Sequence, residues 1–230
     1  MKPVTHWNPK KVMDLPLHWH KPRHVELSMS DLFHEDVPHE FIKAVFSVMV
    51  ACPQHSFQIL TKRPERLVEL SWSGFAEAVW GGSAHFSDAY LKRDWAWPLS
   101  NVWLGVSVEN QRYADERIPL LAQCPAAVRF VSCEPLLSAI DLRPYLPCET
   151  IGGVEFEHWP NWVIIGGESG PSHRPMKVEW VQSIVLQCKE AGVPCFIKQD
   201  SGLRPGEQGR LSDALWNLKE FPNGSGAAPN

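Results

Sequence analysis

Six short apolar runs, separated by helical patterns, constrain the fold of this chain more than any other feature. They are rich in β-branched residues, are too short for helices, and are bounded by residues that favour turns. The runs are His24–Met29, Ser56–Thr61, Val102–Val108, Val128–Ser132, Trp162–Gly166 and Pro194–Lys198. Nearly continuous apolar strands are typical of parallel sheets that are buried on both faces.

Amphipathic helical patterns lie between most of these runs. Pro38–Ala51 starts with a proline suited to a first helical turn, and Pro64–Leu70 predicts a shorter helix. Asn110–Gln123 begins with a capping residue, although Pro119 is expected to kink or end this helix. Met176–Ala191 stops before a glycine, a common helix terminator. Strands that alternate with helices predict an α/β fold built on a parallel sheet or barrel.

Length and composition suit one domain over residues 1–221, with a tryptophan-rich insertion at 71–100 and a disordered tail at 222–230. The net charge of −4 gives no overall basic footprint for nucleic acid. No apolar stretch is long enough to predict a membrane span, and no signal peptide is apparent, so a cytoplasmic protein is expected. The six cysteines contain no C-x-x-C pair and are interpreted as free thiols.

Each predicted strand ends in ionisable residues. The strand-end groups are Ser30-Asp31, Thr61-Lys62-Arg63, Ser107 with Glu109, Cys133-Glu134, Gly166-Gly167-Glu168, and Lys198-Gln199-Asp200. Because the carboxyl ends of parallel strands meet at one edge, these groups predict a functional cleft there. An equally simple explanation is a set of strand-end ion pairs, such as Lys62 with Glu109 and Arg63 with Asp31.

Several longer strings make the sequence similar to a known group. They include PLHWHKPRHVELSMSDLFHEDVP, FQILTKRPERL, NVWLGVSVENQRYADERIPLL, VRFVSCEPLL, WVIIGGESGPSHRPM and VQSIVLQCKEAGVPCFIKQ. In this order they resemble an uncharacterised family of phage and prophage proteins, described as partners of a three-cysteine motif and similar to radical S-adenosylmethionine (SAM) enzymes. The resemblance covers most of residues 4–222 and implies an incomplete parallel (β/α) barrel.

One segment departs from the pattern of that family. There, a strand similar to His6-Trp7-Asn8-Pro9 leads into a loop with three cysteines that hold a 4Fe–4S cluster. Here it is followed directly by Lys10-Lys11-Val12. The resemblance therefore implies that the cluster loop and the helix behind it are missing, so that the N-terminal strand-helix unit is truncated and the cluster ligands are lost. It also places His18, His20 and His24 in an approach to a strand, not in a metal site.

The resemblance implies SAM as the cofactor and a cradle for it at the strand ends. The candidates for this cradle are Ser28, Asp31, Thr61, Lys62, Ser107, Glu109, Glu134, Gly166, Gly167 and Glu168. Lys62 or Arg63 would balance the SAM carboxylate, and Glu109 or Asp31 would hold ribose hydroxyls. The glycines would let the backbone approach the ligand closely. No catalytic residue is assigned.

Three functions remain open at this point. The first is a radical SAM-like protein that has lost its radical chemistry together with the cluster loop. The second is a binding module for a nucleotide, a nucleic acid or the three-cysteine-motif partner protein. The third is a hydrolase that holds a divalent metal with Asp31, Glu109, Glu134 and Glu168, since oxygen-rich sites suit magnesium or manganese.

Overall fold

The computed structural model of the 230-residue chain describes residues 15–28, 30–70, 72–83, 96–147 and 160–222. Three features discussed above lie outside these ranges: the junction at residues 6–12, Cys148, and most of the tail predicted to be disordered. No helix within them is long and apolar enough to cross a membrane.

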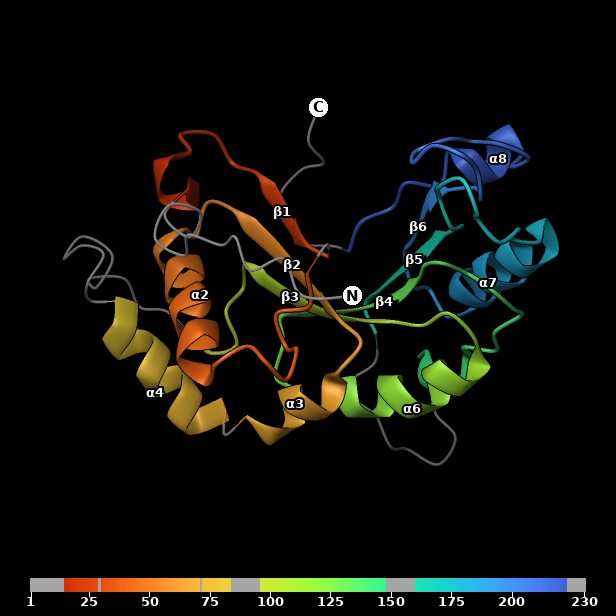
Figure 1. Ribbon diagram of the computed structural model, residues 1–230. Coiled ribbons are helices and arrows are strands. Elements are labelled where there is room, and N and C mark those ends of the chain that lie inside the picture. The colour runs from red at the N-terminus through yellow and green to blue at the C-terminus, as the bar shows by residue number, and fades with distance from the viewer. Residues whose placement is uncertain (1–14, 29, 71, 84–95, 148–159, 223–230) are drawn as a thin grey trace.

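Within these ranges, the fold is a curled sheet of six parallel strands in the order β1-β2-β3-β4-β5-β6. The strands are β1 (His24–Leu27), β2 (Ser56–Thr61), β3 (Val102–Ser107), β4 (Val128–Cys133), β5 (Trp162–Gly166) and β6 (Cys195–Gln199). The sheet curves into a half-barrel whose helices lie on the outer side, as Figure 1 shows. The predicted α/β class and the incomplete barrel are confirmed.

The helices follow the predicted alternation, with additions. They are η1 (Leu15–His18), α2 (His39–Ala51), α3 (Pro64–Glu69), α4 (Trp72–Ser83), α6 (Gln111–Leu121), η2 (Arg143–Tyr145), α7 (Val178–Glu190) and α8 (Asp213–Trp216). Helix α4 lies in the segment predicted only as an insertion, where Phe75 and Val79 are buried and α4 contacts α2. Apolar burial explains why a helix forms there despite its glycines.

Local signals at helix ends had the predicted effects. Asn110 caps α6, because its side-chain oxygen accepts a hydrogen bond from the Tyr113 N–H at 3.2 Å. Gly192 follows α7 with a φ of +66°, a conformation that other residues rarely adopt. Pro119 lies in the last turn of α6, which ends two residues later at Leu121.

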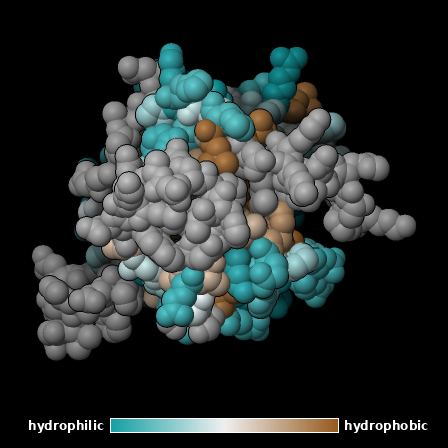
Figure 2. All heavy atoms as spheres, turned by 90° about the vertical axis from the view of Figure 1, so that its left-hand side faces the viewer, coloured by the Kyte–Doolittle hydropathy of each residue, from teal (hydrophilic) through white to brown (hydrophobic). Residues whose placement is uncertain are grey.

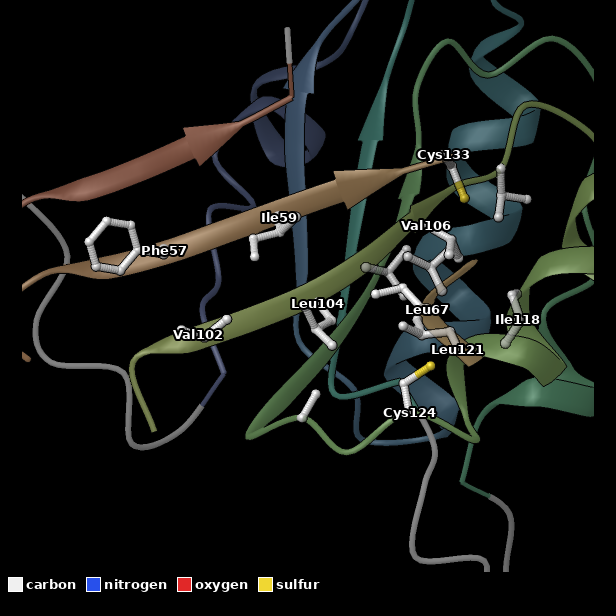
Figure 3. Close-up of a cluster of buried hydrophobic side chains, with 14 of the residues drawn as sticks. Phe57, Ile59, Leu67, Val102, Leu104, Val106, Ile118, Leu121, Cys124 and Cys133 are labelled. Carbon is white, nitrogen blue, oxygen red and sulfur yellow. The ribbon is translucent and has the colours of Figure 1, made fainter. Parts of the chain in front are cut away.

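The main hydrophobic core lies between the convex face of the sheet and the outer helices. Figure 3 shows Ile59, Leu104 and Val106 of the sheet together with Leu67 of α3 and Ile118 of α6. These side chains are at most 2% exposed, and burying such a residue contributes about 1.5–3 kcal/mol. This core determines which side chains of each strand lie on the convex face. The alternate side chains then line the concave face, inside the half-barrel.

A second, aromatic cluster covers part of the concave face. It consists of Trp103, Phe130 and Trp162, with Phe196 and Phe221 packed against it. A Cβ atom at position 105 would lie 2.4 Å from the Phe130 ring. Gly105 of β3 therefore leaves space for the ring of Phe130, its neighbour in β4. The inside of the half-barrel therefore has an aromatic floor.

On the face seen in Figure 2, hydrophilic residues predominate among the coloured atoms, and hydrophobic atoms form small separate spots. Scattered apolar atoms of this kind are normal on a protein surface.

Candidate functional site

The predicted strand-end residues do gather along one edge of the sheet, but many of them bind one another. Asp31, beyond β1, accepts a hydrogen bond from Thr61 Oγ1 at 2.7 Å and pairs with Arg63 Nη1 at 2.8 Å. It also accepts backbone N–H bonds from Phe33 and Lys62. With four donors on two oxygens, Asp31 fastens the β1 and β2 loops together and has little capacity left for a ribose.

Glu109 is also held within the fold. Its carboxylate is 7% exposed and pairs with Arg117 Nη1 at 3.0 Å and with Lys62 Nζ. Arg117 in turn donates to the Ser107 carbonyl at 2.7 Å and lies over the Tyr113 ring at 3.9 Å. This arrangement joins β2, β3 and α6, so the pairing of Lys62 with Glu109 expected as the simpler explanation is present.

The loop after β5 has a similar internal role. Glu168 pairs with Arg174 at 2.8 Å, and hydrogen bonds from this guanidinium and its backbone N–H lower the pKa of Glu168 to about 2. A Cβ atom at position 167 would lie 2.1 Å from the Ser201 backbone nitrogen. The missing side chain of Gly167 therefore makes room for the backbone of the neighbouring loop at Ser201, and not for a ligand.

Glu134 differs from these three carboxylates. It projects from the end of β4 and pairs with Lys198 of β6 at 3.0 Å, with 19% of its side chain exposed. Burial raises the pKa of Glu134, and the negative charge of Glu26 adds to this, while Lys198 opposes it. Gly166 gives this side chain room, since a Cβ there would lie 3.2 Å from Glu134 Cδ.

Glu134 and Lys198 stand at the mouth of a cavity of about 300 Å³ inside the half-barrel. The cavity is lined by His24, Glu26, Ser28, Gln58, Leu60, Phe130, Ser132, Glu134, Trp162, Ile164, Phe196, Lys198 and Phe221. Of the ten predicted residues, only Ser28 and Glu134 line it. Thr61, Ser107 and Gly166 are the last residues of β2, β3 and β5, and the other five lie in the loops at the rim.

Sequence reasoning missed most of the lining residues because they lie within the strands rather than at their ends. They occur at every second position, as at His24, Glu26 and Ser28 of the first strand. That period marks one face of a strand. A polar residue such as Gln58 inside an apolar run was the available signal for this face.

The carboxylates do not form a metal site. Asp31, Glu109, Glu134 and Glu168 each pair with a cationic side chain. Among the described residues, no three His, Cys, Asp or Glu side chains converge as metal ligands. This geometry gives no support to the metal-dependent hydrolase.

The described cysteines do not suit a 4Fe–4S cluster either. All five are buried. Cys52 and Cys124 lie just after α2 and α6, Cys188 lies in α7, and Cys133 and Cys195 lie in β4 and β6. Cys124 and Cys133 belong to the hydrophobic core in Figure 3. A cluster needs several thiolates on one accessible loop, so these residues do not fit the group that the resemblance implies.

Comparison with known proteins shows which family the chain belongs to. A family model described as "Protein of unknown function (DUF5131)" matches residues 3–216. The chain belongs to this family. Membership in DUF5131 therefore covers nearly the whole half-barrel, including both the strand-end loops and the cavity. Searches of curated proteins and of solved structures found no match.

Proposed function

We propose that this chain is a cytoplasmic, phage-derived, radical SAM-like protein that binds SAM at the mouth of the half-barrel without performing radical chemistry alone. The paired charges of Glu134 and Lys198 carry this proposal. SAM ends in an amino acid group that has an ammonium and a carboxylate side by side. Glu134 offers an acceptor for the first and Lys198 a cation for the second.

The accessibility of this pair supports a binding role. The Lys198 side chain is 39% exposed, and its contact with Glu134 spans from β6 to β4 across the cavity mouth. Lys198 is the more exposed partner, so its ammonium can reach a ligand at the cavity mouth, while Glu134 is more enclosed with 19% of its side chain exposed. Glu109, in contrast, would have to break its ion pair with the buried Arg117 in order to bind a ligand.

The proposed lack of radical chemistry rests on the five described cysteines. Cluster ligands must be accessible thiolates, and burial raises the pKa of Cys133 to about 12. The chemistry proposed for this chain is therefore limited to binding and orienting the nucleoside. Whether a three-cysteine-motif partner shares this site is a separate matter for pull-down experiments.

Isothermal titration with SAM and with 5′-methylthioadenosine tests the proposal. The second compound keeps the adenosine and the sulfur but lacks the amino acid group. We expect SAM to bind at least tenfold more tightly, about 1.4 kcal/mol. Lys198→Met should remove most of that preference, and Lys189→Met, an exposed lysine in the last turn of α7, serves as the matched control.

Two results would sink the proposal. One is equal affinity for the two compounds in the unchanged protein, which would mean that the charge pair recognises nothing on SAM. The other is an undiminished preference in the Lys198→Met protein. Thermal melting of each variant confirms that any loss of binding is not a loss of folding.

A further inference from the structure

A layer of polar side chains inside the cavity has no partners within the described chain. The Gln58 side chain lines the cavity, its residue is only 6% exposed, and no hydrogen bond joins its amide to another described residue. The Ser132 hydroxyl, from a residue 2% exposed, is likewise unpaired there. The ring nitrogen His24 Nδ1 is fully buried without a partner.

The Gln58 amide and the Ser132 hydroxyl line the cavity, so their hydrogen-bonding groups are available to a ligand. His24 Nδ1 is the fully enclosed group, and an unsatisfied buried donor or acceptor costs about 1–3 kcal/mol, so native proteins contain few of them. Here the groups of β1, β2 and β4 face one cavity. Gln58 also lies directly beside Glu26 in the strand register, so an amide and a carboxylate stand next to each other on the concave face.

The floor beneath this layer is aromatic. Phe130, Trp162, Phe196 and Phe221 line the same cavity, and the rings of Trp162 and Phe221 are stacked with centroids 5.3 Å apart. His24 packs against Phe221 as well, at 6.1 Å. A flat, aromatic ligand is what such a floor accommodates best.

The charged side chains that line the cavity indicate which kind of aromatic heterocycle would bind there. Glu26 and Glu134 set two carboxylates against the single ammonium of Lys198. An amide such as Gln58 can both donate to and accept from the edge of a heterocycle, as glutamine does with adenine. Carboxylates add acceptors only, so they favour a ring edge that carries amino hydrogens.

We propose that the floor of the half-barrel is a second binding site, for a nucleobase bearing an exocyclic amino group, with Gln58 reading the edge of the base. Adenine, guanine and cytosine have such a group, whereas uracil has none. The cavity of about 300 Å³ holds a ligand of nucleoside size. The base site lies in the same cavity as the SAM site proposed at its mouth, but base binding through Gln58 requires neither SAM nor its amino acid group.

Titration calorimetry with adenosine, guanosine, cytidine and uridine, in the absence of SAM, tests this site. We expect at least one amino-bearing nucleoside to bind about tenfold more tightly than uridine. Gln58→Leu keeps a similar volume but removes the amide, and should weaken that binding by at least tenfold. Gln182→Leu makes the same change at an exposed position of α7 and should have no effect.

Three outcomes would overturn the inference: no nucleoside binds at millimolar concentration, uridine binds most tightly, or Gln58→Leu binds as well as the unchanged protein. Melting curves confirm that the variant is folded, which is expected because leucine suits a buried position. The outcome is separable from that for SAM. Nucleosides that bind to a protein with no preference for SAM over methylthioadenosine would refute the proposed function alone.

Discussion

Replacing Arg117 with methionine separates a structural role of Glu109 from a ligand-binding one. In the folded protein Glu109 is 6% exposed and shares its carboxylate between Arg117 and Lys62. Arg117→Met keeps an apolar stem of similar length but leaves Glu109 beside one half-exposed lysine. Removing one partner of a buried ion pair costs about 3–5 kcal/mol, and the lower end is expected here because Lys62 remains.

Urea unfolding followed by tryptophan fluorescence measures this cost as a fall in the free energy of unfolding. In thermal melts it should appear as a decrease of roughly 2–4 °C for each kcal/mol. Lys62→Met is the control, since a lysine that is 53% exposed should contribute about 0–1 kcal/mol. The double variant Arg117→Met/Glu109→Gln should recover part of the loss, because it removes the buried charge.

The reasoning fails if Arg117→Met is no more destabilising than Lys62→Met. It also fails if the double variant is less stable than Arg117→Met alone. Either result would show that Glu109 does not depend on its buried partner, and would return it to the list of candidate ligand-binding residues.

Three further predictions concern single residues. Gly167→Ala should lower the free energy of unfolding by about 1–3 kcal/mol or more, measured in urea, because its Cβ would meet the Ser201 backbone at 2.1 Å. Burial raises the pKa of Asp200, but hydrogen bonds from Arg210 and Ser201 outweigh it and hold the pKa below its usual value. The stability that this lowered pKa provides is present at neutral pH and lost as the pH falls below about 4. In melting curves, this loss of stability should be smaller for Arg210→Met than for the unchanged protein. Burial raises the pKa of Cys133 to about 12, so its labelling by iodoacetamide at pH 8, followed by mass spectrometry, should be negligible until urea unfolds the protein.

The sequence predicted those parts of the fold that depend on neighbouring residues. Apolar runs located all six strands, and Asn110 and Gly192 marked helix ends, because capping and left-handed backbone are local requirements. The boundaries shifted by one or two residues, as at β1, which ends at Leu27 rather than at 29. Helix α4 was missed because burial against α2, a tertiary effect, stabilises it.

The candidate site was predicted in outline but not in its inner layer. That strand ends meet at one edge follows from parallel order, and this made Glu134 a candidate, whereas Lys198 was not among the ten residues of the predicted cradle. Which carboxylates remain available depends on partners far along the chain, such as Arg63 for Asp31. The role of Gln58 depends on the curvature of the sheet, which no local pattern encodes.

The central claim is that ligands bind on the concave face of the half-barrel, and blocking that face tests it most directly. Ile164 lines the cavity, so Ile164→Trp should fill part of it, whereas Leu186→Trp adds the same ring at a residue 55% exposed on α7. Calorimetry with SAM and with adenosine should show binding that is weakened at least tenfold in a folded Ile164→Trp protein and unchanged in Leu186→Trp. Undiminished binding of both ligands to Ile164→Trp would contradict the account.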